Sequence, residues 1–127
     1  MERGNIIQEL IKAYSAELQT VENYMAASVN LDGVRLDVIK NHSRGYYRRI
    51  HAGQRLAARV KTVGGTVPGS LALHRDQSYL QPPQDPTDVV TVIKGVITAE
   101  EAFIANYNRI TRGNSKAQVH FAAEMHP

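Results

Sequence analysis

The sequence of 127 residues contains no cysteine. Disulfides and thiolate metal sites are therefore excluded, and metal ligands could only be carboxylate, imidazole, tyrosine or backbone oxygen. This set of ligands suits iron, manganese or zinc.

The chain also lacks an apolar run near the ~18 residues that a membrane span needs. Its N-terminus lacks the charged-then-apolar pattern of a signal peptide. We therefore expect a cytoplasmic protein with no membrane partner.

Concentrated positive charge is also missing. The net charge is only +3, the Lys and Arg residues are spread along the chain, and aromatic residues make up 6% of it. Nucleic-acid-binding proteins usually gather basic residues on one face. We therefore do not predict a nucleic-acid partner, and DNA protection by a basic shell has little support. The length predicts one domain over residues 1–127 that can bury a core of its own.

One pattern occurs twice in the chain. It is Glu-x6-Tyr, with Asn before the Tyr, at Glu17 to Tyr24 and again at Glu100 to Tyr107. Each copy lies in a seam of mostly apolar residues spaced alternately four and three apart, the stripe that a helix turns toward a core. The seams are Leu10, Tyr14, Glu17, Val21 and Tyr24, and Val89, Ile93, Val96, Glu100, Phe103, Tyr107 and Ile110. Both carboxylates thus occupy core positions.

A buried ionised carboxylate costs several kcal/mol unless it is paired or bound to a cation. Two in equivalent positions need a common reason, and a shared metal ion is the simplest. The alternative is that each Glu lies at the edge of its stripe and reaches water.

Helical patterns cover residues 5–30, 34–63 and 88–110, so we predict an all-α fold with three main helices. Asn5 is the expected N-cap of the first helix, Gly64 and Gly65 end the second, and Thr87 or Asp88 caps the third. The Pro- and Gly-rich stretch 64–87 is long for a loop in a compact domain, which predicts a crossover. After Gly113, residues 115–125 could form only a short helix, so a fourth helix is missing or vestigial.

Several motifs resemble a known family. They are Glu17-x6-Tyr24, His51-Ala52, Leu56-Ala-Ala-Arg59, Gly64-Gly65-x-Val-Pro68, Leu80-Gln-Pro-Pro83 and residues 99–107. Over residues 5–110 the chain resembles bacterioferritin-type or rubrerythrin-type members of the ferritin-like superfamily. The resemblance implies a four-helix-bundle relative with a long crossover, and a diiron site made of two Glu and two Glu-x-x-His motifs. It also implies iron storage, or oxidoreductase activity such as Fe(II) oxidation by oxygen or peroxide.

Carried over to this sequence, the resemblance implies Glu17, His51 and Glu100 as metal ligands, with Glu101 as a substitute for Glu100. The metal would be iron, with manganese or zinc in its place as alternatives. The sequence departs from the pattern because Arg48, not Glu, stands three residues before His51. No fourth helix supplies a second Glu-x-x-His, and His120, Glu124 and His126 do not form one. The predicted site is therefore incomplete, and no other catalytic or cofactor-binding residue is predicted.

Two functions stay open at this stage. One is a diiron-carboxylate protein with ferroxidase or related activity, and the other is a metal-free helical bundle with a structural or interaction role. In either case, three core seams without a full fourth helix leave an apolar groove. A partner copy could cover that groove, so we expect a homo-oligomer, either a dimer or a larger assembly.

The family pattern is lost only in the middle of the second helix, around Asn41 to Arg49, and is present on both sides of it. Two compensating frameshifts would produce such a local loss. Codons for residues 44–53, read one base later and then restored, can give Ala-Asp-Ile-Thr-Glu-Glu-Phe-Met-His-Gly. That segment contains a Glu-x-x-His. We therefore hypothesise that residues 41–53, and by the same kind of event residues 111–127, are frameshift products.

Overall fold

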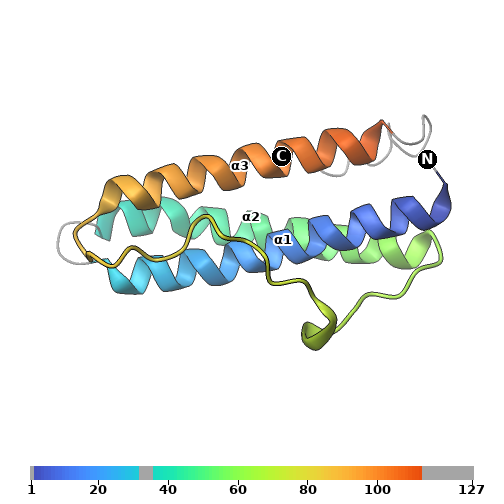
Figure 1. Cartoon of the computed structure of the whole chain (residues 1–127), viewed down its shortest axis with the longest axis horizontal. Coiled ribbons are helices and arrows are strands. Elements are labelled where there is room, and N and C mark those ends of the chain that lie inside the picture. Colours follow the sequence, from blue (N-terminus) through green and yellow to red (C-terminus); the bar gives the residue numbers. More distant parts are fainter. Residues whose placement is uncertain (1, 32–35, 113–127) are drawn as a thin grey trace.

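A computed structural model of the chain describes residues 2–31 and 36–112, and it describes no side chains between 36 and 46. It contains the helices α1 (Arg3–Asn30), α2 (Leu36–Thr62) and α3 (Val89–Thr111), and a short 3-10 helix, η2 (Ser70–Ala72) (Figure 1). The described part has no strand. The predicted all-α fold with three main helices is confirmed, and each boundary lies within two residues of its expected position. The short helix expected at 115–125 lies outside the described residues.

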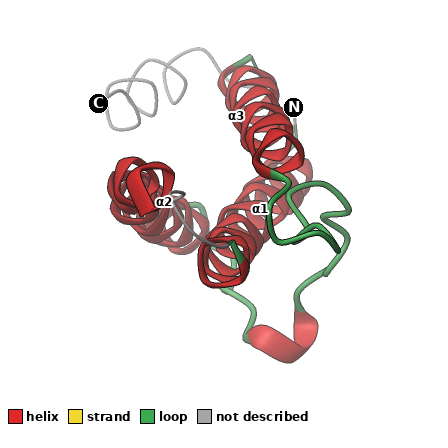
Figure 2. Cartoon of the chain, turned by 90° about the vertical axis from the view of Figure 1, so that its left-hand side faces the viewer, coloured by secondary structure: helices red, strands yellow, loops and turns green. Residues whose placement is uncertain are grey.

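The three helices pack with α1 in the middle. Helix α1 contacts α2 on one side and α3 on the other (Figure 2). Helices α2 and α3 both run opposite to α1, so the chain after α2 must return along the whole bundle before α3 can begin (Figure 1). This explains why the connector is long, as predicted.

The principal core lies near the start of α1 and the end of α2. Leu10, Leu56 and Val60 are almost fully buried there, and Ile110 closes the cluster from α3. A second cluster joins Tyr24, Leu80 and Ala99, and so ties the crossover to α1 and α3. Apolar burial of this kind contributes about 25 cal/mol per Å² and holds the three helices together.

The helix ends agree with the sequence at two places and differ at one. Helix α2 ends as expected at Gly64, whose φ of 92° suits only glycine, and the Gly65 amide donates to the Val60 carbonyl at 2.8 Å. The Asp88 carboxylate caps α3 by accepting from the Thr91 amide at 3.0 Å. Asn5 is not an N-cap, because α1 already begins at Arg3, without a side-chain cap.

The buried face of α3 also differs from the predicted seam. The buried residues are Val92, Gly95, Ala99 and Ile110, whereas Ile93 and Glu100 are exposed. The crossover explains the difference, because Leu80 packs directly on Gly95. A Cβ at residue 95 would lie 2.8 Å from the Leu80 Cα. Only a glycine permits that approach, so the small residues of α3 face inward.

Candidate functional site

The two glutamates of the repeated pattern meet at one arginine from α2. The Arg49 Nη1 atom donates to both carboxylate oxygens of Glu17, at 3.3 and 3.4 Å. Its Nη2 atom forms an ion pair with the Glu100 carboxylate. The structure therefore brings Glu17 and Glu100 to one cation. The sequence predicts a shared metal ion at this place, whereas the cation here is a guanidinium supplied by the chain itself.

The cluster is buried on the α1 side and open on the α3 side. The side chains of Glu17 and Arg49 are 5% and 7% exposed, whereas that of Glu100 is 52% exposed. Burial raises the pKa of Glu17 from 4.5 to about 7, although the charge and hydrogen bonds of Arg49 oppose this shift. Burial acts against the charge of Arg49, but Glu17 and Glu100 outweigh it and raise the pKa of Arg49.

Aromatic residues complete the surroundings of the guanidinium. Its Cζ atom lies 4.5 Å from the centroid of the Phe103 ring, a favourable cation–π arrangement. Tyr24 is buried nearby, and its pKa is raised first by burial and then by the charge of Glu100. Tyr107, the matching residue of the second copy, packs instead on Phe103 and on the Leu10 cluster. The two copies of the pattern are therefore not equivalent in the fold.

The buried face of α2 decides which of its residues reach this cluster. Arg49, Ala52 and Leu56 are buried at spacings of three and four, while Arg48 and His51 are exposed. Residues two apart on a helix do not share a face, so His51 points away from the side that presents Arg49. The structure thus joins two of the three predicted ligands, Glu17 and Glu100, and does not bring His51 to them.

The family pattern draws attention to Arg48, whereas the residue that reaches the two glutamates is Arg49. A signal for Arg49 was present, because counting back four residues from Val60 leads to Leu56, and counting back four and seven from Leu56 leads to positions 52 and 49. Such heptad-like counting identifies the core face of a helix even where a charged residue interrupts it. Here the charged residue that interrupts the apolar face of α2 is Arg49, which belongs to the site.

The residues present do not fit a two-metal centre. The carboxylate oxygens of Glu17 and an oxygen of Glu100 already accept from Arg49, and a cation placed between them would be repelled by its charge. Within the parts of the chain whose side chains are described, no three His, Asp or Glu residues gather into a group that could hold a metal ion. Reaching a diiron site would require both removing the guanidinium and adding ligands.

Comparison with known proteins gives one finding. A family model for a ferritin-like domain matches residues 7–120. Neither curated proteins nor solved structures give a significant match. None of the described helices is long and apolar enough to span a bilayer.

Proposed function

The chain belongs to the ferritin-like domain family, and we propose that it acts as a metal-free helical bundle with a structural or interaction role. The observation that carries this proposal is the position of Arg49, which forms ion pairs with both Glu17 and Glu100. In this family, paired carboxylates serve to bind iron. Here the same two carboxylates are paired with one arginine side chain of the protein.

A guanidinium can replace a metal ion as a charge but not as a chemical centre. It is always protonated and offers only N–H donors to the carboxylates, so it supplies no open coordination position and no redox step. In this chain, Glu17 and Arg49 hold α1 against α2, and Glu100 attaches α3 to the same point. The cluster therefore joins all three helices at one point.

Metal content after purification tests the proposal. The full chain is produced in iron-supplemented medium, its metal content is measured, and the apoprotein is then titrated anaerobically with Fe(II). We expect iron far below one ion per chain and no saturable binding at micromolar Fe(II). One or two irons per chain that survive dialysis would overturn the proposal.

The second candidate is iron binding with ferroxidase or related oxidoreductase activity. Glu100 favours it, because a half-exposed carboxylate could release Arg49 and turn with Glu17 toward a metal ion from solution. His51 would be the third ligand, and manganese or zinc could replace iron. Oxidation of Fe(II) by the wild type, faster than by Glu17→Ala, would establish this function in place of the first.

Self-association is part of the same proposal. Helix α3 exposes Ile93, Ile97 and Ile104, which are 42%, 52% and 55% exposed, beside the open side of Glu100. Their spacings of four and seven place them on one face of the helix. Monomeric proteins rarely expose a contiguous apolar stripe, so we infer that this face packs against a second copy of the chain.

A further inference from the structure

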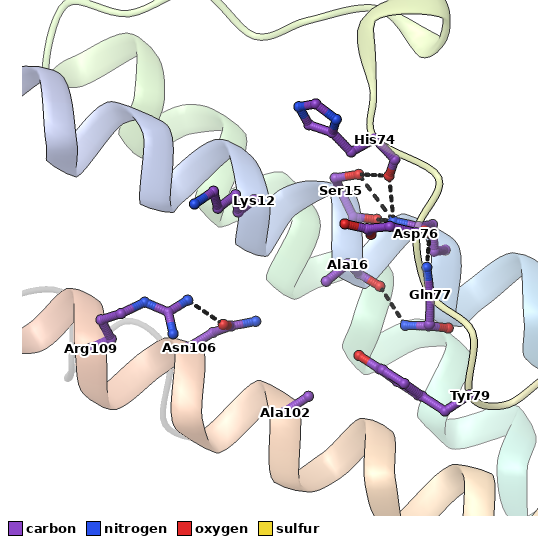
Figure 3. Close-up of a pocket in the computed structure, with 11 residues that line it drawn as sticks. Lys12, Ser15, Ala16, His74, Asp76, Gln77, Tyr79, Ala102, Asn106 and Arg109 are labelled. Carbon is purple, nitrogen blue, oxygen red and sulfur yellow. Dashed lines mark hydrogen bonds between the residues drawn. The ribbon is translucent and has the colours of Figure 1, made fainter.

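A second feature is a groove bounded by three segments of the chain. Its floor is α1, one wall is the crossover at residues 74–79, and the other wall is α3 (Figure 3). Its volume is about 430 Å³, within the range of small-molecule sites. Ala16 and Ala102 leave the space open between α1 and α3, and Tyr79 reaches into it from the crossover.

A buried amide network fixes the crossover wall. Gln19 donates from Nε2 to the His74 carbonyl at 2.7 Å, and its Oε1 accepts from the Gln77 amide at 2.8 Å. Gln77 in turn donates to Thr20 at 2.9 Å and accepts from Asn23 at 2.7 Å. Because the side chains of Gln19 and Gln77 use both their donors and their acceptors in these hydrogen bonds, the backbone of the crossover is held in place without a ligand.

The rim of the groove carries polar groups that the network does not use. The Asp76 carboxylate, the His74 imidazole and the Tyr79 hydroxyl have no hydrogen bond or ion pair with any residue that the structure describes. All three sit on the anchored segment, so their positions follow from the backbone that Gln19 and Gln77 hold. They are available to a bound molecule.

Positive and negative side chains lie on different segments around the groove. Lys12 on α1 and Arg109 on α3 both bind Glu9, at 3.7 and 2.5 Å, so two cations share one carboxylate. That end of the groove keeps an excess positive charge. Asp76, on the crossover, supplies a negative charge that forms no ion pair with a described residue, since the neighbouring Arg75 pairs with Glu22. A ligand that matches both ends carries one negative and one positive group.

We propose that this groove binds a small zwitterion, such as an ω-amino acid or a short peptide. Its carboxylate would contact Lys12 and Arg109, its ammonium group would contact Asp76, and its aliphatic part would lie on Ala102 and the Tyr79 ring. The groove shares no residue with the Glu17, Arg49 and Glu100 cluster, so the proposal does not depend on whether that cluster binds metal.

Matched ligands test the charge pattern directly. The full-length protein is titrated with 6-aminohexanoate, hexanoate and hexylammonium, and binding is followed by calorimetry and by amide chemical shifts. We expect 6-aminohexanoate to bind about tenfold more tightly than either single-charge analogue, because it alone makes both ionic contacts; a tenfold difference corresponds to about 1.4 kcal/mol. Shorter homologues such as 4-aminobutanoate then measure the span between the charged walls.

Variants assign each end of the ligand. Asp76→Asn should weaken 6-aminohexanoate about tenfold and leave hexanoate unchanged, while Arg109→Gln should weaken both of these and leave hexylammonium unchanged. Glu101→Gln and Arg55→Gln, exposed residues that do not line the groove, serve as charge-matched controls. Circular dichroism verifies that each variant is folded. Absence of saturable binding, equal affinity for all three ligands, or unchanged binding by Asp76→Asn would each overturn the proposal.

Discussion

Arg49 donates to both carboxylate oxygens of Glu17 from a single Nη1 atom, at 3.3 and 3.4 Å, with both side chains almost fully buried. This pair joins α1 to α2 in the part of the bundle where α3 also attaches through Glu100. Removing one partner of a buried ion pair leaves an uncompensated charge, which costs more than the pair itself contributes. The fold should therefore be sensitive to position 49.

We predict that Arg49→Met lowers the free energy of unfolding by about 3–5 kcal/mol at pH 8, where Glu17 is ionised in the wild type. At pH 5 the loss should be smaller, because Glu17 can be protonated and no charge is then stranded. Urea unfolding at both pH values measures the difference. The double variant Arg49→Met/Glu17→Gln should recover much of the stability, and a double variant as unstable as Arg49→Met would contradict this explanation.

The stability of the wild type should fall as the pH rises from about 4.5 to 7. Glu17 binds its proton more tightly in the folded state than in the unfolded state, where its pKa is near 4.5, so deprotonation favours unfolding across this interval. The shift corresponds to a change on the order of 3 kcal/mol. Asp88 acts outside this window, because its hydrogen bonds with Thr91 lower its pKa below 3.8.

Thermal or urea unfolding from pH 4.5 to 8 checks this dependence. Glu17→Gln should remove most of the slope, because the amide does not titrate. Glu22→Gln is a suitable control, since Glu22 lies on α1 like Glu17 and forms an exposed ion pair with Arg75 of the crossover. An unchanged slope in Glu17→Gln would show that another group titrates.

Much of the fold could be predicted because its signals are local. The four-three spacing, Gly64 and the Asp88 cap each act within a few residues, and the helix boundaries follow from them. The site was predicted only in part, because it depends on contacts between residues that are far apart in the sequence. That Glu17 and Glu100 would need one cation follows from their positions, but which cation they meet depends on α2, far away in the sequence. From the sequence alone, an arginine within an apolar seam only indicates an interrupted helix pattern; its role becomes clear from its ion pairs with the two glutamates.

Adding ligands on the buried face of α2 should create iron binding. We predict that Arg49→Glu/Ala52→His binds Fe(II) at least tenfold more tightly than the wild type, because it removes a repelling charge and adds two ligands beside Glu17. Anaerobic titration with Fe(II) measures the affinity.

Arg48→Glu is the matched control for this design. It completes a Glu-x-x-His with the native His51, but on the exposed face of α2. We expect no gain in iron affinity from it. If Arg48→Glu bound iron as well as the buried design, His51 would be the ligand after all and the packing of α2 would need to change.

The exposed isoleucines of α3 predict self-association. Ile97→Lys should shift the protein toward smaller species in analytical ultracentrifugation at micromolar concentration, because it places a charge in the middle of the apolar stripe. Val29→Lys, at a more exposed site on α1, is the control and should leave the assembly unchanged. A wild type that is monomeric throughout would contradict the proposed interface.

The nucleotide sequence of the gene should permit the shifted reading of residues 44–53. That reading puts a glutamate at position 49 and a histidine at position 52, the two buried positions of α2 that lie three apart beside Glu17. Sequencing the gene decides the matter, because codons incompatible with the one-base shift would exclude it. The expected events at 111–127 fall mostly outside the described residues.

The contact between Gly95 and Leu80 also fixes the lengthwise position of α3. Leu80 has a positive φ of 62°, and its backbone meets α3 where no side chain intervenes. Sliding α3 by one turn would bring Thr91 or Ala99 to that spot, where a Cβ would collide with Leu80. Helix α3 therefore has a single register against the crossover. Gly95, five positions before Glu100, thereby fixes where Glu100 lies along the bundle and allows it to reach Arg49.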